Sequence, residues 1–99
     1  MTRVLIVDDQ AMIRVGIRAI LESQDDLTVV GEADNGRAGV DRYRSLRPDV
    51  VLMDVRMPVL DGLAAARAIL GPDRVEGHST RVLMLTTFDL DDYVYEALR

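Results

Sequence analysis

The sequence predicts an α/β fold with a doubly wound parallel sheet, and three observations carry this prediction. Largely apolar runs at residues 3–7 and 49–53 are typical of strands covered on both faces. Segments of helical periodicity alternate with the strands along the chain. Both runs end in aspartate, at Asp8-Asp9 and at Asp54. Because such sheets bind ligands outside the carboxyl ends of their strands, we expect a site there.

Length and composition limit the possible classes of protein. The 99 residues suffice for one domain, and 48% hydrophobic with 29% charged residues is ordinary for a globular chain. A net charge of −5 argues against direct nucleic acid binding by this segment. The chain has no cysteine for a disulfide and no apolar stretch of the ~20 residues that span a membrane. We therefore expect a cytoplasmic protein.

The first half of the chain contains two predicted helices around a second strand. The first helix covers 10–23, and the next strand covers 27–32. The second helix begins at Asn35-Gly36 and ends before Pro48, whose ring removes a backbone donor. The inward faces of the two helices are predicted to comprise Ile13, Ile17, Ile20 and Leu21 in the first, and Val40, Tyr43 and Leu46 in the second.

The second half repeats the alternation of strand and helix. The strand at 49–53 leads to a helix that starts at Asp61-Gly62, with Asp61 as its N-cap, and ends at Leu70. Residues 71–80 read as a polar surface connection, in which His78 is expected to be solvated. A fourth strand at 81–86 and a last helix beginning at Asp89 complete the chain.

Right-handed crossovers and the usual doubly wound topology favour the strand order 2-1-3-4. The connections then diverge between strands 1 and 3, which brings Asp8, Asp9 and Asp54 together. Three convergent carboxylates repel one another unless a cation joins them, and Mg²⁺ is a hard ion that prefers oxygen ligands. The sequence therefore predicts a magnesium site suited to phosphate chemistry.

The ordered motifs resemble the receiver domain of two-component response regulators over the whole chain. They comprise Val-Asp-Asp-Gln at 7–10, Asp54, Met-Pro at 57–58, Asp-Gly at 61–62 and Thr86-Thr87. The flavodoxin-like fold of that family has the sheet order expected above. The helix start from Gln10 to Arg14 and the Leu-Thr-Thr-Phe-Asp run are most similar to the NarL/LuxR subfamily, whose members usually carry a DNA-binding domain.

The resemblance implies a role for each site residue. Asp54 would accept a phosphoryl group from a sensor histidine kinase, and the domain would assist this transfer without being a turnover enzyme. Asp9, Asp54 and the backbone carbonyl of Arg56 would ligate Mg²⁺, while Asp8 would act mainly through bound water. The Thr86 hydroxyl would hydrogen-bond the phosphoryl group.

The resemblance also implies that family elements lie beyond residue 99. The family's fifth strand, which ends in a lysine beside the site, and its last helix would follow Arg99. We therefore expect residues 1–99 to be a truncated receiver domain that phosphorylates poorly by itself, with a DNA-binding domain in the parent protein. With strand 4 as an apolar sheet edge, we also expect a homodimer.

Two alternatives to a receiver domain stay open at this point. A magnesium-dependent phosphohydrolase could use an aspartyl-phosphate intermediate, although such enzymes usually have an Asp-x-Asp spacing and an insert that builds a pocket. An interaction module could keep the fold without the chemistry, against which the three aspartates argue. Met53, Met57 and Met84 are predicted to be packing residues of the core or of a loop.

Overall fold

The computed structural model describes residues 1–55, 57, 59–72 and 74–85. The strands are β1 (Thr2–Val7), β2 (Leu27–Ala33), β3 (Val50–Asp54) and β4 (Arg81–Leu85). The helices are α1 (Ala11–Glu22), α2 (Gly36–Leu46) and α3 (Gly62–Leu70). The strands form one parallel sheet in the order β2-β1-β3-β4, as the sequence predicts. The last predicted helix and Thr86 lie outside the described residues.

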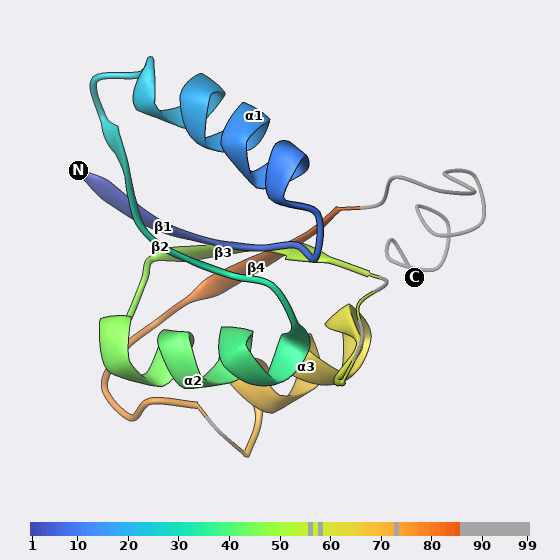
Figure 1. The fold of residues 1–99 in the computed structure, drawn as a ribbon. Coiled ribbons are helices and arrows are strands. Elements are labelled where there is room, and N and C mark those ends of the chain that lie inside the picture. The colour runs from blue at the N-terminus through green and yellow to red at the C-terminus, as the bar shows by residue number, and fades with distance from the viewer. Residues whose placement is uncertain (56, 58, 73, 86–99) are drawn as a thin grey trace.

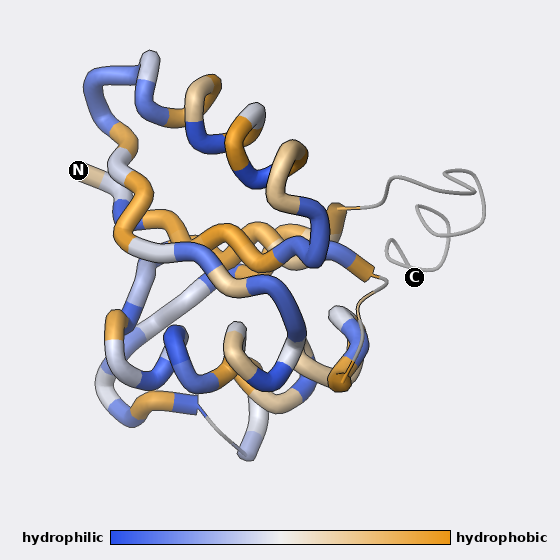
Figure 2. The backbone as a smooth tube through the Cα atoms, in the orientation of Figure 1, coloured by the Kyte–Doolittle hydropathy of each residue, from blue (hydrophilic) through white to orange (hydrophobic). Residues whose placement is uncertain are grey.

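The sheet separates two layers of helix. Figure 1 shows α1 above the sheet, and α2 and α3 together below it. Alternate side chains of each strand enter the two layers, so Leu5 and Val7 of β1 pack towards α2 and α3, while Val4 and Ile6 pack towards α1. The apolar strands therefore have both faces in contact with other residues, and in Figure 2 they form the hydrophobic centre of the molecule.

The layer below the sheet is the well-packed one. Val40 and Tyr43 of α2 are almost fully buried, as are Ala65 and Ile69 of α3. The Tyr43 hydroxyl accepts a hydrogen bond of 2.7 Å from the Val75 amide, which ties the connection between α3 and β4 to the core. The predicted inward face of α2 is confirmed, with Leu46 packed partly buried against the same cluster.

The layer above the sheet corrects one prediction. Ile17 and Leu21 pack against the β1 and β2 side chains, but Ile20 is 67% exposed. Consecutive helix residues point about 100° apart, so Ile20 points about 100° away from Leu21. Because Ile17 and Leu21 contact the sheet, the Ile20 side chain faces away from it. The predicted inward face was therefore one residue too wide.

Two caps explain where α2 and α3 begin. The Asn35 side chain accepts a hydrogen bond from the Ala38 amide, and Asp61 accepts one from the Ala64 amide, each at 2.8 Å. The Asp61 cap is therefore confirmed. Helix α2 ends at Leu46, and its C-cap residue Arg47 adopts a left-handed conformation (φ 49°) immediately before Pro48.

The connection from 71 to 80 corrects a second prediction. His78 is not a solvated loop residue, because its Nε2 donates a hydrogen bond of 2.8 Å to the Pro48 carbonyl and its side chain is partly buried. The Thr80 hydroxyl donates to the same carbonyl at 2.7 Å. His78 therefore helps to hold this connection against the end of α2.

Candidate metal and phosphoryl site

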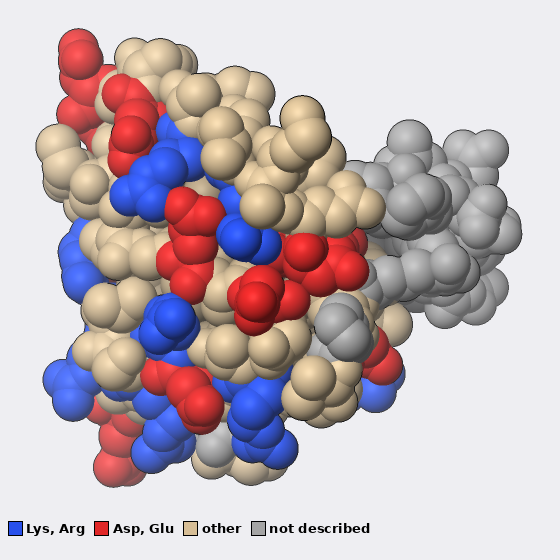
Figure 3. Space-filling model, viewed as in Figure 1, with Lys and Arg blue, Asp and Glu red and all other residues tan. Residues whose placement is uncertain are grey.

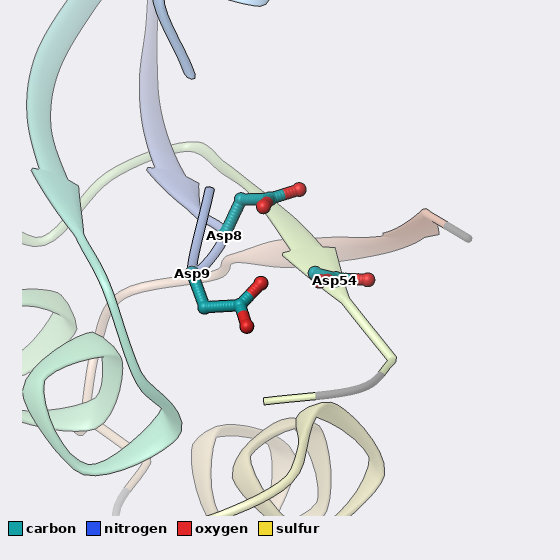
Figure 4. Close-up of side chains that lie close together, drawn as sticks. All are labelled: Asp8, Asp9 and Asp54. Carbon is teal, nitrogen blue, oxygen red and sulfur yellow. The ribbon is translucent and has the colours of Figure 1, made fainter. Parts of the chain in front are cut away.

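The strand register brings the three aspartates to one level of the sheet. Val7 of β1 pairs with Met53 of β3, so the residues that follow, Asp8 and Asp54, emerge side by side. Ligand oxygens of Asp8, Asp9 and Asp54 all lie within 4.8 Å of one another. Figure 4 shows the three carboxylates around one space at the carboxyl ends of β1 and β3. The convergence predicted from the sequence is therefore confirmed as geometry.

The three carboxylates differ in their burial. Asp8 and Asp54 are 1% and 5% exposed, whereas Asp9 is exposed to solvent. In Figure 3, acidic side chains gather on the surface at this end of the molecule, next to basic ones. A cation among these carboxylates could therefore keep waters on its solvent-exposed side, as Mg²⁺ usually does.

Asp8 is held rigidly but has one oxygen without a partner. Its Oδ1 accepts a hydrogen bond of 2.8 Å from the Gln10 amide, and its own amide donates to the Ala33 carbonyl at 3.0 Å. Its Oδ2 is buried and makes no hydrogen bond to any described residue. A buried carboxylate oxygen without a partner is costly, so the site fits a cation that would satisfy this atom.

The electrostatics of the site favour the same conclusion. Burial raises the pKa of the Asp8 carboxyl above its ordinary value, and the nearby Asp9 charge raises it further. The hydrogen bond from Gln10 and the Arg14 charge act in the opposite direction without cancelling the shift. The pocket therefore opposes the charge of Asp8, and a bound divalent cation would relieve that cost.

The loop after β3 approaches Asp54 very closely at Gly62. The Gly62 amide donates a hydrogen bond of 2.9 Å to the Val55 carbonyl. A Cβ on residue 62 would lie 1.8 Å from the Asp54 carbonyl oxygen, which is far inside van der Waals contact. Only glycine fits this position, so the Asp-Gly pair both starts α3 and fixes the backbone of Asp54.

Two predicted site residues lie outside the described part of the chain, and two residues that were not predicted are linked to the site by hydrogen bonds. Arg56 and Thr86 lie outside the described residues, so their roles stay predictions. The Arg14 guanidinium contacts both the Asp8 carbonyl and the Glu32 carboxylate, and neither Arg14 nor Glu32 was predicted to belong to the site. A basic residue in the first turn of a helix that begins just after two aspartates was the signal that could have revealed Arg14.

Comparison with known proteins assigns the chain to a family. A sequence model described as "Response regulator receiver domain" matches residues 4–99. The chain belongs to this family. The receiver domain from the putative response regulator NarL of Mycobacterium tuberculosis superimposes with a TM-score of 0.84 at 37% identity, over 98% of this chain and 75% of that one. The fold is therefore that of a receiver domain.

Relatives of this receiver domain include regulators with different further domains. The uncharacterized transcriptional regulatory protein YxjL of Bacillus subtilis is 40% identical over 98% of this chain and 43% of its own length. A protein-glutamate methylesterase/protein-glutamine glutaminase of Methanosarcina mazei is 43% identical over 92% of this chain and 24% of its own length. The chain thus spans less than half of either relative and resembles NarL/LuxR-like transcription regulators along nearly all of its residues. Within the part of the chain that the structure describes, no helix is long and apolar enough to cross a membrane.

Proposed function

We propose that this receiver domain accepts a phosphoryl group from a sensor histidine kinase on Asp54, with Mg²⁺, and controls a transcription-regulating output domain. The observation that carries the proposal is the approach of the three aspartate carboxylates within 4.8 Å around the orphaned Asp8 oxygen. A carboxylate oxygen of Asp54 would attack phosphorus as the bond to the kinase imidazole breaks. The step needs positioning and charge neutralisation more than other chemistry from the protein.

The proposal gives each carboxylate a task. Asp54 is the acceptor and a metal ligand, Asp9 is the more accessible metal ligand, and Asp8 acts mainly through bound water at its free oxygen. Mg²⁺, when bound, would neutralise the carboxylates and the charge on the transferring group. The Arg56 carbonyl as a further ligand and the Thr86 hydroxyl as a phosphoryl partner belong to the proposal as well.

The domain organisation is likewise proposed. Similarity to YxjL along nearly all of this chain supports a DNA-binding output domain beyond these residues, and a cytoplasmic location is proposed with it. The methylesterase relative illustrates the alternative of an enzymatic output. The coding sequence that adjoins this chain distinguishes the two.

The central test is phosphoryl labelling of the full-length protein with Mg²⁺ and acetyl phosphate. We expect one phosphoryl group per chain by intact-protein mass spectrometry, and none in Asp54→Asn, because an amide is not a nucleophile at neutral pH. Asp61→Asn is a matched control, since asparagine also caps the α3 N-terminus and should label normally.

Each alternative function predicts a different result in this experiment. Undiminished labelling of Asp54→Asn would remove Asp54 as the acceptor. Continuous phosphate release without a stable adduct would indicate a phosphohydrolase, and no reaction in any variant would indicate an interaction module without the chemistry.

We also propose that residues 1–99 by themselves, without the family's fifth strand, associate as a homodimer. Within the described residues β4 is the last strand of the sheet, and its Leu83 side chain is 55% exposed. An edge strand with exposed apolar side chains is a template for a second chain. We expect multi-angle light scattering of residues 1–99 at micromolar concentration to give twice the monomer mass, and Leu83→Lys to lower it. A monomer at every concentration would contradict the dimer.

A further inference from the structure

We propose that Arg14 is a positioning residue for the acidic site, holding the backbone of Asp8 and Asp9 through a guanidinium that is itself anchored on Glu32. The inference rests on the proposed magnesium-dependent function and adds a residue to it. It starts from one contact: Arg14 Nη1 donates a hydrogen bond of 2.6 Å to the Asp8 carbonyl oxygen. That carbonyl belongs to the peptide unit that joins Asp8 to Asp9.

Hydrogen bonds hold both the guanidinium of Arg14 and its backbone. While Nη1 contacts Asp8, Nε donates to Glu32 Oε1 at 2.9 Å, and the side chain is only 19% exposed. Its backbone is fixed too, since the Arg14 amide donates to the Gln10 carbonyl in the first turn of α1. A planar fork can reach two acceptors at once, whereas a lysine ammonium is a point charge on a flexible stem. The contact therefore depends on arginine geometry as well as on charge.

Glu32 is in turn a well-held anchor on β2. Its carboxylate also accepts a hydrogen bond from Arg18 Nη1, and its carbonyl accepts one of 2.8 Å from Arg42 Nε. Burial acts to raise the pKa of Glu32, but hydrogen bonds from Arg18 and Arg14 outweigh it and lower that pKa below the ordinary value. Glu32 is thus charged at neutral pH, and it joins α1 to the edge of the site.

Positioning and charge predict opposite effects on metal binding. The positive charge of Arg14 repels Mg²⁺, so charge alone would make an Arg14 variant bind the ion more tightly. If the contact to Asp8 positions the ligands, its loss weakens binding, as loss of groups that orient metal ligands usually does. Whether the Arg14 variants bind Mg²⁺ more weakly or more tightly therefore decides between positioning and charge.

The chain offers a matched control in Arg18. Arg18 lies on the same helix and also pairs with Glu32, but its other partner is Glu22 and no contact joins it to Asp8 among the described residues. Arg14→Met and Arg18→Met thus remove the same charge and one Glu32 ion pair each. Arg14→Lys keeps the positive charge but removes the planar guanidinium that can donate to two acceptors at once.

The test is calorimetric titration of Mg²⁺ into the metal-free, full-length protein and these three variants. We expect Arg14→Lys and Arg14→Met to weaken Mg²⁺ binding ~10-fold, and Arg18→Met to change it by less than about 2-fold. Urea unfolding without Mg²⁺ should show that Arg14→Met and Arg18→Met lower the free energy of unfolding by similar amounts. This result would separate positioning of the ligands from a general loss of structure.

Several results would overturn the inference. Unchanged or tighter Mg²⁺ binding in Arg14→Lys and Arg14→Met would show that the contact does not position the ligands. An equal loss in Arg18→Met would assign the effect to the Glu32 ion pairs. Failure of the unaltered protein to bind Mg²⁺ at all would instead overturn the proposed function, and this inference with it.

Discussion

Gly62→Ala is expected to destabilise the fold by about 3 kcal/mol and to slow phosphoryl labelling of Asp54 ~100-fold. The new Cβ would meet the Asp54 carbonyl oxygen at 1.8 Å, the Asp54 carbonyl carbon at 2.7 Å and the Val55 Cα at 2.9 Å. All three are backbone atoms, which cannot rotate away as a side chain can. The strand end or the start of α3 must therefore shift.

The loss of labelling follows from the same displacement. Moving Asp54 by even about 1 Å misplaces its carboxylate relative to the metal and the phosphoryl donor. Gly16→Ala is the control, because a Cβ there has no atom within 4 Å and alanine favours the helix, so we expect a gain of about 0.5–1 kcal/mol. Urea unfolding and labelling rates measure both effects. Wild-type stability in Gly62→Ala would mean that the loop does not approach Asp54 so closely.

Asp8→Asn is expected to act in opposite directions on stability and on metal binding. The metal-free protein should gain about 1 kcal/mol at neutral pH, because the variant removes a buried charge that faces Asp9 and Asp54. The amide keeps an oxygen that can accept the Gln10 hydrogen bond. Mg²⁺ affinity should fall ~100-fold, since the ion loses a charged partner in its site.

The pH dependence of stability follows from the raised pKa of Asp8. Because the native state holds this proton more tightly than the unfolded chain, the metal-free protein loses stability as pH rises from the ordinary value of 3.8 through the raised native pKa. Above that window both states are ionised and this contribution stays constant. The stability of Asp8→Asn should therefore not fall with rising pH across this window as that of the unaltered protein does.

Urea unfolding at acidic and neutral pH without Mg²⁺, with calorimetry for the ion, measures these effects. Asp41→Asn removes the same charge from the exposed side of α2 and should change neither stability nor Mg²⁺ binding appreciably. A loss of stability in metal-free Asp8→Asn at neutral pH would show that the Asp8 charge is compensated by its surroundings.

The sequence by itself determined the order of strands and helices and the chemical character of the site. Apolar runs ending in Asp8-Asp9 and Asp54 predict strands with ligands at their ends, and Asp61 is readable as a cap, because each depends on neighbours within a few residues. The sheet order was also predictable, since the topology of parallel crossovers leaves few alternatives.

Only the tertiary structure decided which contacts complete these elements. Helical periodicity could not tell whether Ile20 or Leu21 faces the sheet, and local sequence could not show that His78 reaches the Pro48 carbonyl. Arg14 of α1 contacts both Asp8 and Glu32, and Glu32 lies 18 positions further along the chain on strand β2. Such contacts depend on how finished elements pack, because residues distant in the chain meet only after the sheet and its helices have been brought together.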